Sequence, residues 1–343
     1  MATRASGTEA KHLPVFFFHG ITGNPGEAVN LERVLAENGT VLVALSYAPS
    51  EESTQALHIQ VPLAIKQIRE IVATDKRFQH GYAFIGHSQG GLMARAVVEE
   101  MDDHQVHTLI SLAGVQNGLF YGPQPSDRVP LSHLLTGFGP TIMPGFDFDT
   151  YLKSDDPAAV RGGVQAAIAQ FIIDHPELQD KFSFVNVARF PAQQQWVQAN
   201  TFLPALNNLN QCEPNDEQGV QDQQRRKRNF LKLRAAHFFS SPGDDVVAPW
   251  QLSIFGQYSH VDSVAEIATK FETLKVLGMR ETDEYIDDTF GLKTLDEHGG
   301  LFLHEVPDVP HCGWITDGPL VDDPSATCEF RAVFDKFVLP SLP

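Results

Sequence analysis

The sequence has 343 residues, of which 42% are hydrophobic, and it contains 24 phenylalanines, enough for a large buried core. It has no run of about 18 apolar residues, so we expect no transmembrane segment. The formal net charge of −18 is spread along the chain and argues against a nucleic acid or an anionic membrane as a partner.

Residues 1–12, MATRASGTEAKH, form a polar N-terminal tail without the apolar core of a secretory signal. The chain as given is therefore not expected to enter the secretory pathway, which leaves a cytoplasmic location open. The three cysteines have no metal-ligand spacing and are too few for a disulfide scaffold. Cys312 and Cys328 either pair in an oxidising compartment or remain free thiols.

The first third of the chain alternates between short apolar runs and segments with helical spacing of apolar residues. Such alternation predicts a parallel sheet with helices on both faces. The expected strands lie at 13–20, 40–47, 82–87 and 107–114, and the expected helices at 24–39, 54–75 and 89–100.

The alternation stops after Gly114, where Gly and Pro recur through residues 117–200. We expect a lid-like insertion at about 117–230, which interrupts a single domain at 13–343. Arg225 to Arg228 are expected to open a helix and to lie on its solvated face. Further strands are predicted at 234–241 and 300–307, and a last helix at 329–338.

The pentapeptide Gly86-His87-Ser88-Gln89-Gly90 fits the pattern G-x-S-x-G, with an expected strand before it and an expected helix after it. This context predicts that Ser88 is a nucleophile on a sharp turn. The flanking glycines, Gly86 and Gly90, allow neighbouring backbone to pass. The alternative is a glycine-rich turn with an inert serine.

A serine nucleophile needs a base, and the base usually needs a carboxylate that orients it. In such folds the acid and then the histidine follow the serine along the chain. Asp244 and Asp245 follow the strand at 234–241, and His311 follows the strand at 300–307. We prefer Asp244 as the acid and expect Asp245 to order the turn. His19 is a rival base, although a structural role suits it better because it precedes the serine.

The oxyanion of an acyl transfer needs backbone N–H donors. Gln89 follows the nucleophile and supplies the first donor. Ile21 follows the first strand and supplies the second, and Gly20 allows this backbone to approach.

Several longer segments resemble the palmitoyl-protein thioesterases, more closely the second type than the first. The segments are HGITGNP, GHSQGGLMARAV, LISLAGVQNGLFYG, SSPGDDVVAPWQLSIFGQY, TFGLKTLDEHGGL and VPHCGWITD. The resemblance implies a lysosomal α/β-hydrolase that cleaves fatty acyl thioesters of S-acylated proteins or acyl-CoA. It implies the triad Ser88, Asp244 and His311, with the oxyanion held by Ile21 and Gln89.

The expected reaction is a two-step acyl transfer through an acyl-enzyme, which requires no metal or cofactor. Phe120, Phe138 and Phe146 either line the acyl chain or only anchor the insertion to the sheet. An oxygen-ester lipase or carboxylesterase of the same fold is the first alternative. The second is an inactive acyl-binding protein.

Overall fold

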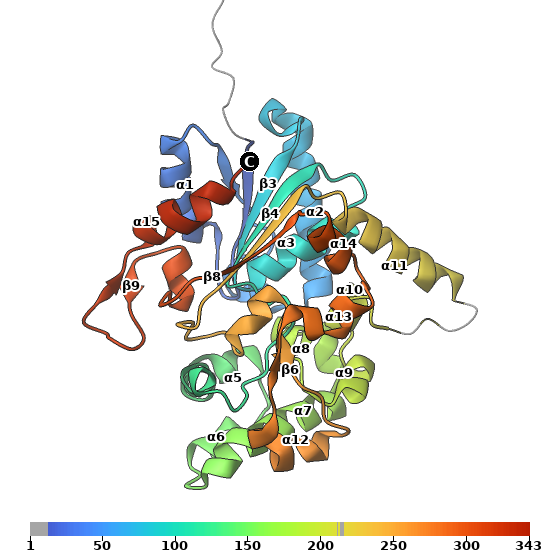
Figure 1. Cartoon of the computed structure of the whole chain (residues 1–343), viewed down its shortest axis with the longest axis vertical. Coiled ribbons are helices and arrows are strands. Elements are labelled where there is room, and N and C mark those ends of the chain that lie inside the picture. Colours follow the sequence, from blue (N-terminus) through green and yellow to red (C-terminus); the bar gives the residue numbers. More distant parts are fainter. Residues whose placement is uncertain (1–12, 211, 213–215) are drawn as a thin grey trace, which may run out of the picture.

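The computed structural model describes residues 13–210, 212 and 216–343, and the predicted polar tail at 1–12 lies outside this range. A central sheet of six parallel strands has the order β2-β1-β3-β4-β5-β8 (Figure 1). The strands are β1 (Val15–Phe18), β2 (Leu42–Ala44), β3 (Tyr82–His87), β4 (Val106–Leu112), β5 (Ala235–Ser240) and β8 (Leu301–Glu305).

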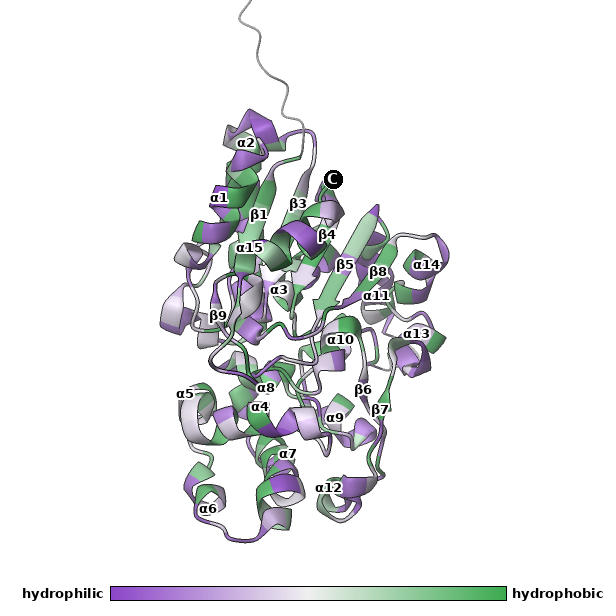
Figure 2. Cartoon of the chain, turned by 60° about the vertical axis from the view of Figure 1, so that its left-hand side comes forward, coloured by the Kyte–Doolittle hydropathy of each residue, from purple (hydrophilic) through white to green (hydrophobic). Residues whose placement is uncertain are grey.

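The inner strands are apolar on both faces because helices cover both. Phe16 and Phe84 lie in one buried cluster, whereas Phe17 and Ile85, one position along each strand, lie in the other. Figure 2 shows the hydrophobic residues concentrated on these strands. The first cluster packs under α2 (Leu57–Thr74) and α3 (Gln89–Glu100), and the second under α1 (Val29–Glu37) and α15 (Phe330–Val333). The predicted α/β-hydrolase fold, with a mostly parallel sheet and helices on both faces, is confirmed.

Short helices cover the carboxyl ends of the strands (Figure 1). They come from the chain between β4 and β5 and are α4 (Arg128–His133), α5 (Gly139–Ile142), α6 (Phe148–Leu152), α7 (Val164–Asp174), α8 (Ser183–Val187), α9 (Gln193–Ala199) and α10 (Leu203–Leu206). A second segment, containing β6 (Gln257–Tyr258), α12 (Val264–Lys270) and β7 (Val276–Leu277), packs against α7. We call residues 124–206 and 257–277 the helical layer. The assignment of residues 13–343 to one domain with an insertion at about 117–230 stays a prediction.

The predicted start of the basic helix is wrong. This helix, α11, spans Glu217–Phe230, so the four basic residues lie in its second half. The Asp216 side chain accepts a hydrogen bond from the Gly219 N–H and caps the helix start, while the basic residues suit the negative end of the helix dipole. Arg225 is half-buried and pairs with Glu100 of α3, so only part of this face is solvated.

Two further helices, α13 (Asp283–Ile286) and α14 (Leu292–Glu297), precede the last strand of the sheet.

Cys312 is exposed, Cys328 is buried, and both are free thiols. Within the described ranges, no helix is both long enough and apolar enough to span a bilayer.

Candidate active site

Ser88 occupies the sharp turn between β3 and α3. Its backbone has φ +56° and ψ −128°, a conformation that non-glycine residues rarely adopt. A Cβ at position 86 would lie 2.2 Å from the Gly90 carbonyl oxygen, and one at position 90 would lie 2.1 Å from the Phe18 carbonyl oxygen. Both positions therefore require glycine, and the turn packs directly on the end of β1.

The loops after β5 and β8 bring Asp244 and His311 together. His311 Nδ1 donates to the Asp244 carboxylate, with separations of 2.9 Å to Oδ2 and 3.1 Å to Oδ1. Both residues are 5% exposed, so little water competes for this contact. Because Nδ1 carries the proton that Asp244 accepts, Nε2 is the ring nitrogen left to act as a base.

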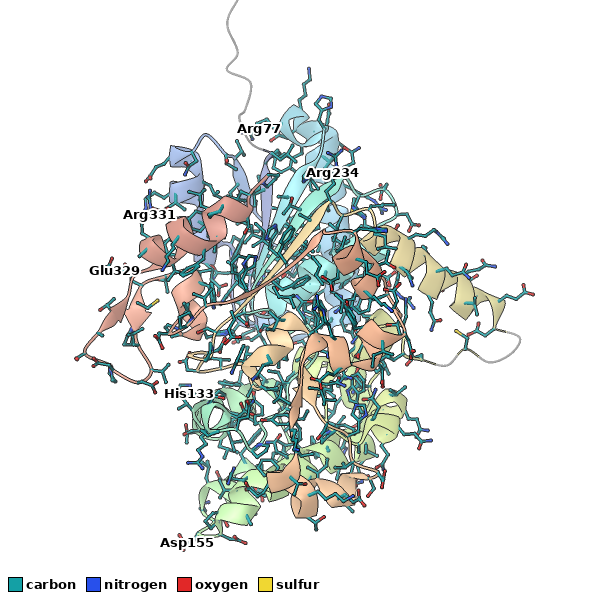
Figure 3. All side chains as sticks on the ribbon, in the orientation of Figure 1. Arg77, His133, Asp155, Arg234, Glu329 and Arg331 are labelled. Carbon is teal, nitrogen blue, oxygen red and sulfur yellow. The ribbon has the colours of Figure 1, made fainter. Side chains whose placement is uncertain are left out.

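The two neighbouring aspartates have different contacts. Asp244 Oδ1 also accepts the N–H groups of Val246 and Val247, at 2.9 and 2.8 Å, which fixes the carboxylate. Asp245 Oδ1 accepts the backbone N–H of His311 at 2.9 Å instead. The Asp245 carbonyl oxygen lies 2.8 Å from Nδ1 of His133, which Figure 3 labels on α4. Asp244 thus contacts the imidazole, while Asp245 holds the two loops and the helical layer in place.

Several carboxylates surround the His311 ring. Burial lowers the pKa of His311, but the charges of Asp244, Asp245 and Glu27 more than offset burial, and the net pKa is raised. Glu27 was not identified from the sequence as part of this site. It lies seven residues after Gly20, whose N–H donates to its carboxylate at 3.2 Å. An acidic residue this close to the expected oxyanion loop is the sequence signal that could have identified Glu27.

The residue before Ser88 contacts the loop that carries His311. His87 Nε2–H donates to the His311 carbonyl oxygen at 2.9 Å, and the two rings lie 4.8 Å apart. Burial and the neighbouring His311 lower the pKa of His87 to about 3, so this ring is neutral. No hydrogen bond joins Ser88 Oγ to His311 in the described structure, and such bonds often tighten only when substrate binds.

The two predicted oxyanion donors both have unused N–H groups. Gly20, Thr22 and Gly23 each donate their N–H to a protein acceptor. Among the described residues, none accepts the N–H of Ile21, which lies between them. The Gln89 N–H lies in the first turn of α3, where backbone donors have no helical acceptor. A Cβ at position 20 would lie 3.2 Å from Ser88 Cβ, so Gly20 keeps the two segments close.

The rival base, His19, has a different environment. It is fully buried, and its ring stacks on Tyr47 at 4.7 Å. Burial lowers the pKa of His19, and its Nδ1 lies 3.0 Å from the Gly20 carbonyl oxygen. These contacts fit a residue that shapes the loop.

A small apolar cavity of about 40 Å³ adjoins Ser88. Its lining includes Ile21, Gln89, Tyr121 and Phe138, with Val246 and Val247 from the acid loop. Of the three phenylalanines that were candidates to line the acyl chain, only Phe138 lines this cavity. Phe120 packs edge-on against Tyr258, and Phe146 packs among Phe148, Tyr151 and Phe171 inside the helical layer.

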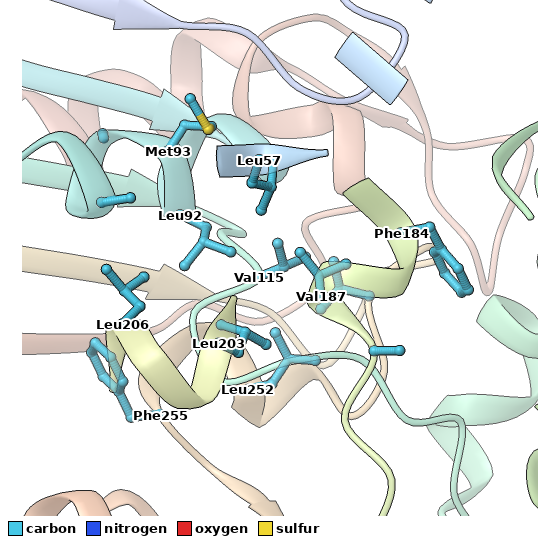
Figure 4. Close-up of a cluster of buried hydrophobic side chains, with 14 of the residues drawn as sticks. Leu57, Leu92, Met93, Val115, Phe184, Val187, Leu203, Leu206, Leu252 and Phe255 are labelled. Carbon is cyan, nitrogen blue, oxygen red and sulfur yellow. The ribbon is translucent and has the colours of Figure 1, made fainter. Parts of the chain in front are cut away.

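Apolar packing joins this cavity to the interior of the molecule. Val115, Phe184 and Val187 line the cavity and also belong to the cluster in Figure 4, which joins α3 to the helical layer.

Across the described ranges, no group of three or more His, Cys, Asp or Glu side chains is placed to hold a metal ion.

The family model for palmitoyl protein thioesterases matches residues 14–311. The chain belongs to this family. The match begins just before β1 and ends at His311, so it contains Ser88, Asp244 and every other residue proposed for the site.

Relatives within the thioesterase family are similar along most of their length. The chain is 27% identical to lysosomal thioesterase PPT2-B of Xenopus laevis, covering 88% of each chain. It is 28% identical to human lysosomal thioesterase PPT2, covering 91% of this chain and 86% of that protein. The corresponding Drosophila melanogaster homologue is 25% identical, covering 89% of this chain and 88% of the relative.

The solved structures to which the chain is similar include lipases. The mature lipase BlEst2 of Bacillus licheniformis matches with a TM-score of 0.44 and 11% identity, over 99% of this chain and 96% of that chain. A soluble variant of Saccharomyces cerevisiae monoglyceride lipase matches with a TM-score of 0.44 and 12% identity, over 99% and 88% of the two chains.

Proposed function

We propose that this thioesterase-family hydrolase cleaves long-chain fatty acyl thioesters, of S-palmitoylated proteins or of acyl-CoA, with Ser88, His311 and Asp244 as its triad. The contact between the Asp244 carboxylate and His311 Nδ1 carries the proposal, because it leaves Nε2 as the base and orients the ring. Ser88 on its strained turn supplies the nucleophile.

In the first step, His311 Nε2 takes the Ser88 proton as Oγ attacks the thioester carbonyl carbon. The N–H groups of Ile21 and Gln89 stabilise the negative charge that develops on the carbonyl oxygen. The intermediate collapses with cleavage of the carbon–sulfur bond, and the imidazolium returns its proton to the departing sulfur. The free thiol and an acyl-Ser88 ester result.

In the second step, His311 deprotonates a water molecule, which attacks the acyl-Ser88 ester. Collapse of this second intermediate releases the fatty acid and returns the proton to Ser88 Oγ. The negative charge of Asp244 stabilises the imidazolium formed in each step, which agrees with the raised pKa of His311, where burial acts against the three surrounding carboxylates.

A long acyl chain needs more space than the cavity beside Ser88 provides. Pockets that hold small ligands have volumes of roughly 300–1,000 Å³, whereas this cavity has about 40 Å³. A second cavity of about 480 Å³ lies in the helical layer and is lined by Leu135 and Gly122, among others. The segment Leu134–Phe138 contributes Leu135 to the large cavity and Phe138 to the small one. We propose that this segment moves and that the acyl chain extends between the two cavities.

The relatives named above are called lysosomal thioesterases, and we extend that location to this chain as part of the proposal. Imaging of the tagged full-length protein with lysosomal and cytoplasmic markers tests it. A cytoplasmic distribution would contradict the location without affecting the chemistry.

The function is tested by hydrolysis of palmitoyl-CoA and p-nitrophenyl palmitate between pH 4.5 and 8. We expect a preference for the thioester, and Ser88→Ala should reduce turnover by at least about 10³-fold. A preference for the oxygen ester would indicate a lipase or carboxylesterase. Absence of Ser88-dependent turnover on both substrates would indicate an acyl-binding protein.

The neighbouring aspartates provide a matched pair of variants for the acid. Asp244→Asn should lower kcat by orders of magnitude, because the amide no longer stabilises the imidazolium. Asp245→Asn keeps an oxygen that accepts the His311 N–H and should retain most activity. The reverse pattern would assign the acid to Asp245.

A further inference from the structure

The Tyr121 hydroxyl is a buried polar group that the mechanism above does not use. The residue is 2% exposed, and its hydroxyl has no hydrogen-bond partner in the described part of the chain. Buried polar groups in folded proteins almost always have a partner, so an unpaired one at a functional site needs an explanation. One explanation is a partner that arrives with the substrate.

Tyr121 lines the same cavity as Ser88 and both proposed oxyanion donors. Its backbone is fixed on both sides. The N–H groups of Phe120 and Tyr121 donate to the Ala248 carbonyl oxygen at 2.9 Å and to Gln165 Oε1 at 3.2 Å, and the Gly122 N–H donates to Asp127 Oδ2 at 3.0 Å. A ring on such a fixed segment is held in place before substrate binds, which reduces the entropy lost on binding.

Two aspartates act on the Tyr121 hydroxyl through their charges. Burial, together with the negative charges of Asp244 and Asp127, raises the pKa of Tyr121, so the hydroxyl keeps its proton and acts as a donor. Val246 and Val247 of the acid loop also line the cavity. The acyl chain of the substrate has no hydrogen-bond acceptor, so an acceptor that arrives with the substrate belongs to the thioester or to its thiol half.

We propose that Tyr121 is a positioning residue for the thiol half of the substrate, with its hydroxyl donating a hydrogen bond to an amide carbonyl close to the thioester sulfur. This inference rests on the proposed function. Pantetheine thioesters carry such an amide two methylenes from sulfur, and S-acyl cysteine in a polypeptide carries peptide amides on the carbon next to its methylene. One donor can therefore serve both classes, and it discriminates against esters whose leaving group has no amide.

The test compares Tyr121→Phe with wild type on palmitoyl-CoA and on S-ethyl thiopalmitate. These substrates share the acyl chain and the thioester, but only the first has an amide in its thiol half. We expect kcat/KM to fall about tenfold or more on palmitoyl-CoA and to change less than about twofold on S-ethyl thiopalmitate. The melting temperature should stay the same or rise, because the variant removes a hydroxyl that is unpaired in the free protein.

Tyr258→Phe is the matched control. The Tyr258 hydroxyl donates to Asp127 Oδ2 at 2.5 Å and accepts the Gln124 N–H at 3.3 Å. Removal of this hydroxyl leaves the buried Asp127 carboxylate without one of its hydrogen-bond donors, so the melting temperature should fall. The values of kcat/KM on the two substrates should change alike.

Three results would overturn the inference: unchanged kinetics of Tyr121→Phe on palmitoyl-CoA, an equal loss on both substrates, or a melting temperature as low as that of Tyr258→Phe. The same assay includes Ser88→Ala. If the proposed function fails, wild type shows no Ser88-dependent turnover. If only the inference fails, wild type shows Ser88-dependent turnover of palmitoyl-CoA and Tyr121→Phe gives one of these three results.

Discussion

At the scale of single residues, three carboxylates set the protonation of His311. Asp244 contacts the ring, Asp245 accepts its backbone N–H, and the third carboxylate, Glu27, raises the pKa of His311 by its charge, with burial opposing all three. The base must be neutral to accept the Ser88 proton, so activity is lost as the pH falls through this pKa. The raised pKa therefore predicts an acid limb above the ordinary value of about 6.5.

Glu27→Gln tests this electrostatic effect. The amide oxygen still accepts the Gly20 N–H, but the negative charge is gone, so the imidazolium loses stabilisation and its pKa falls. We expect the acid limb of kcat/KM to move to lower pH, with the plateau at high pH nearly unchanged. The measurement is a pH profile on palmitoyl-CoA from pH 4.5 to 8.

Glu32→Gln is the control for Glu27→Gln, because Glu32 is an exposed residue of α1 and should leave the profile unchanged. An unmoved acid limb in Glu27→Gln would mean that Glu27 is already protonated over this pH range. Burial raises the pKa of Glu27, so the experiment is sensitive to that outcome.

At the scale of elements, the turn between β3 and α3 depends on the absence of side chains. A Cβ at position 90 would meet the Phe18 carbonyl oxygen, whereas nothing lies within 4 Å of one at position 137, in the helical segment Leu134–Phe138. Gly90→Ala should destabilise the protein by about 3 kcal/mol or more and abolish activity. Gly137→Ala should stabilise it by about 0.5 to 1 kcal/mol, because alanine is the better helix former.

Urea unfolding of the two glycine variants measures both effects. Equal stability of Gly90→Ala and wild type would show that α3 can shift away from β1, and the close approach would then not explain the glycine at this position.

The elements that could be predicted from the sequence have strong local patterns. β3 and α3 have the predicted bounds, because residues 82–85 are apolar and α3 begins directly at the motif. The helices of the helical layer were not predicted, since most are shorter than two turns, and α4, α5 and α10 contain glycine or proline. Their stability comes from packing against distant segments, which local propensity does not report.

The same distinction applies to the candidate site. Ser88, Asp244 and His311 each follow a strand of the sheet, so chain order and topology brought them to one edge. Phe120 and Phe146 were candidates either to line the acyl chain or to anchor the insertion, and their positions depend on how the helical layer packs. Sequence composition shows that phenylalanines are present, and only the fold determines which one reaches the cavity.

At the scale of the whole molecule, a buried polar network joins the sheet to the helical layer. Arg189 donates to Glu284 Oε1 at 2.7 Å and to Asn117 Oδ1 at 2.5 Å. Asn207 donates to the same Glu284 oxygen at 3.1 Å and accepts from Arg95 of α3 at 2.5 Å. All five side chains are at most 5% exposed. They come from α3, from the loop after β4, from the helical layer and its end, and from α13, so one network connects four parts of the chain.

Burial opposes the charge of Glu284, but Arg189 and Asn207 more than offset it, and the net pKa of Glu284 is lowered. Removal of one partner leaves the other charge buried without compensation. Glu284→Gln and Arg189→Met should therefore each cost about 3 to 5 kcal/mol of unfolding free energy. The double variant Arg189→Met/Glu284→Gln should cost less than the sum, because no unpaired charge remains.

Asp149→Asn is the control, since it removes an exposed ion pair between Asp149 of α6 and Lys153 and should leave the unfolding free energy close to that of wild type. Urea unfolding of the single and double variants gives the coupling energy. Additive losses would show that Arg189 and Glu284 act through separate contacts. A large coupling would mean that the pair anchors the helical layer to the sheet. The single variants should then also lose hydrolysis of long-chain thioesters, because Phe138 lines the cavity beside Ser88 only when that layer is docked.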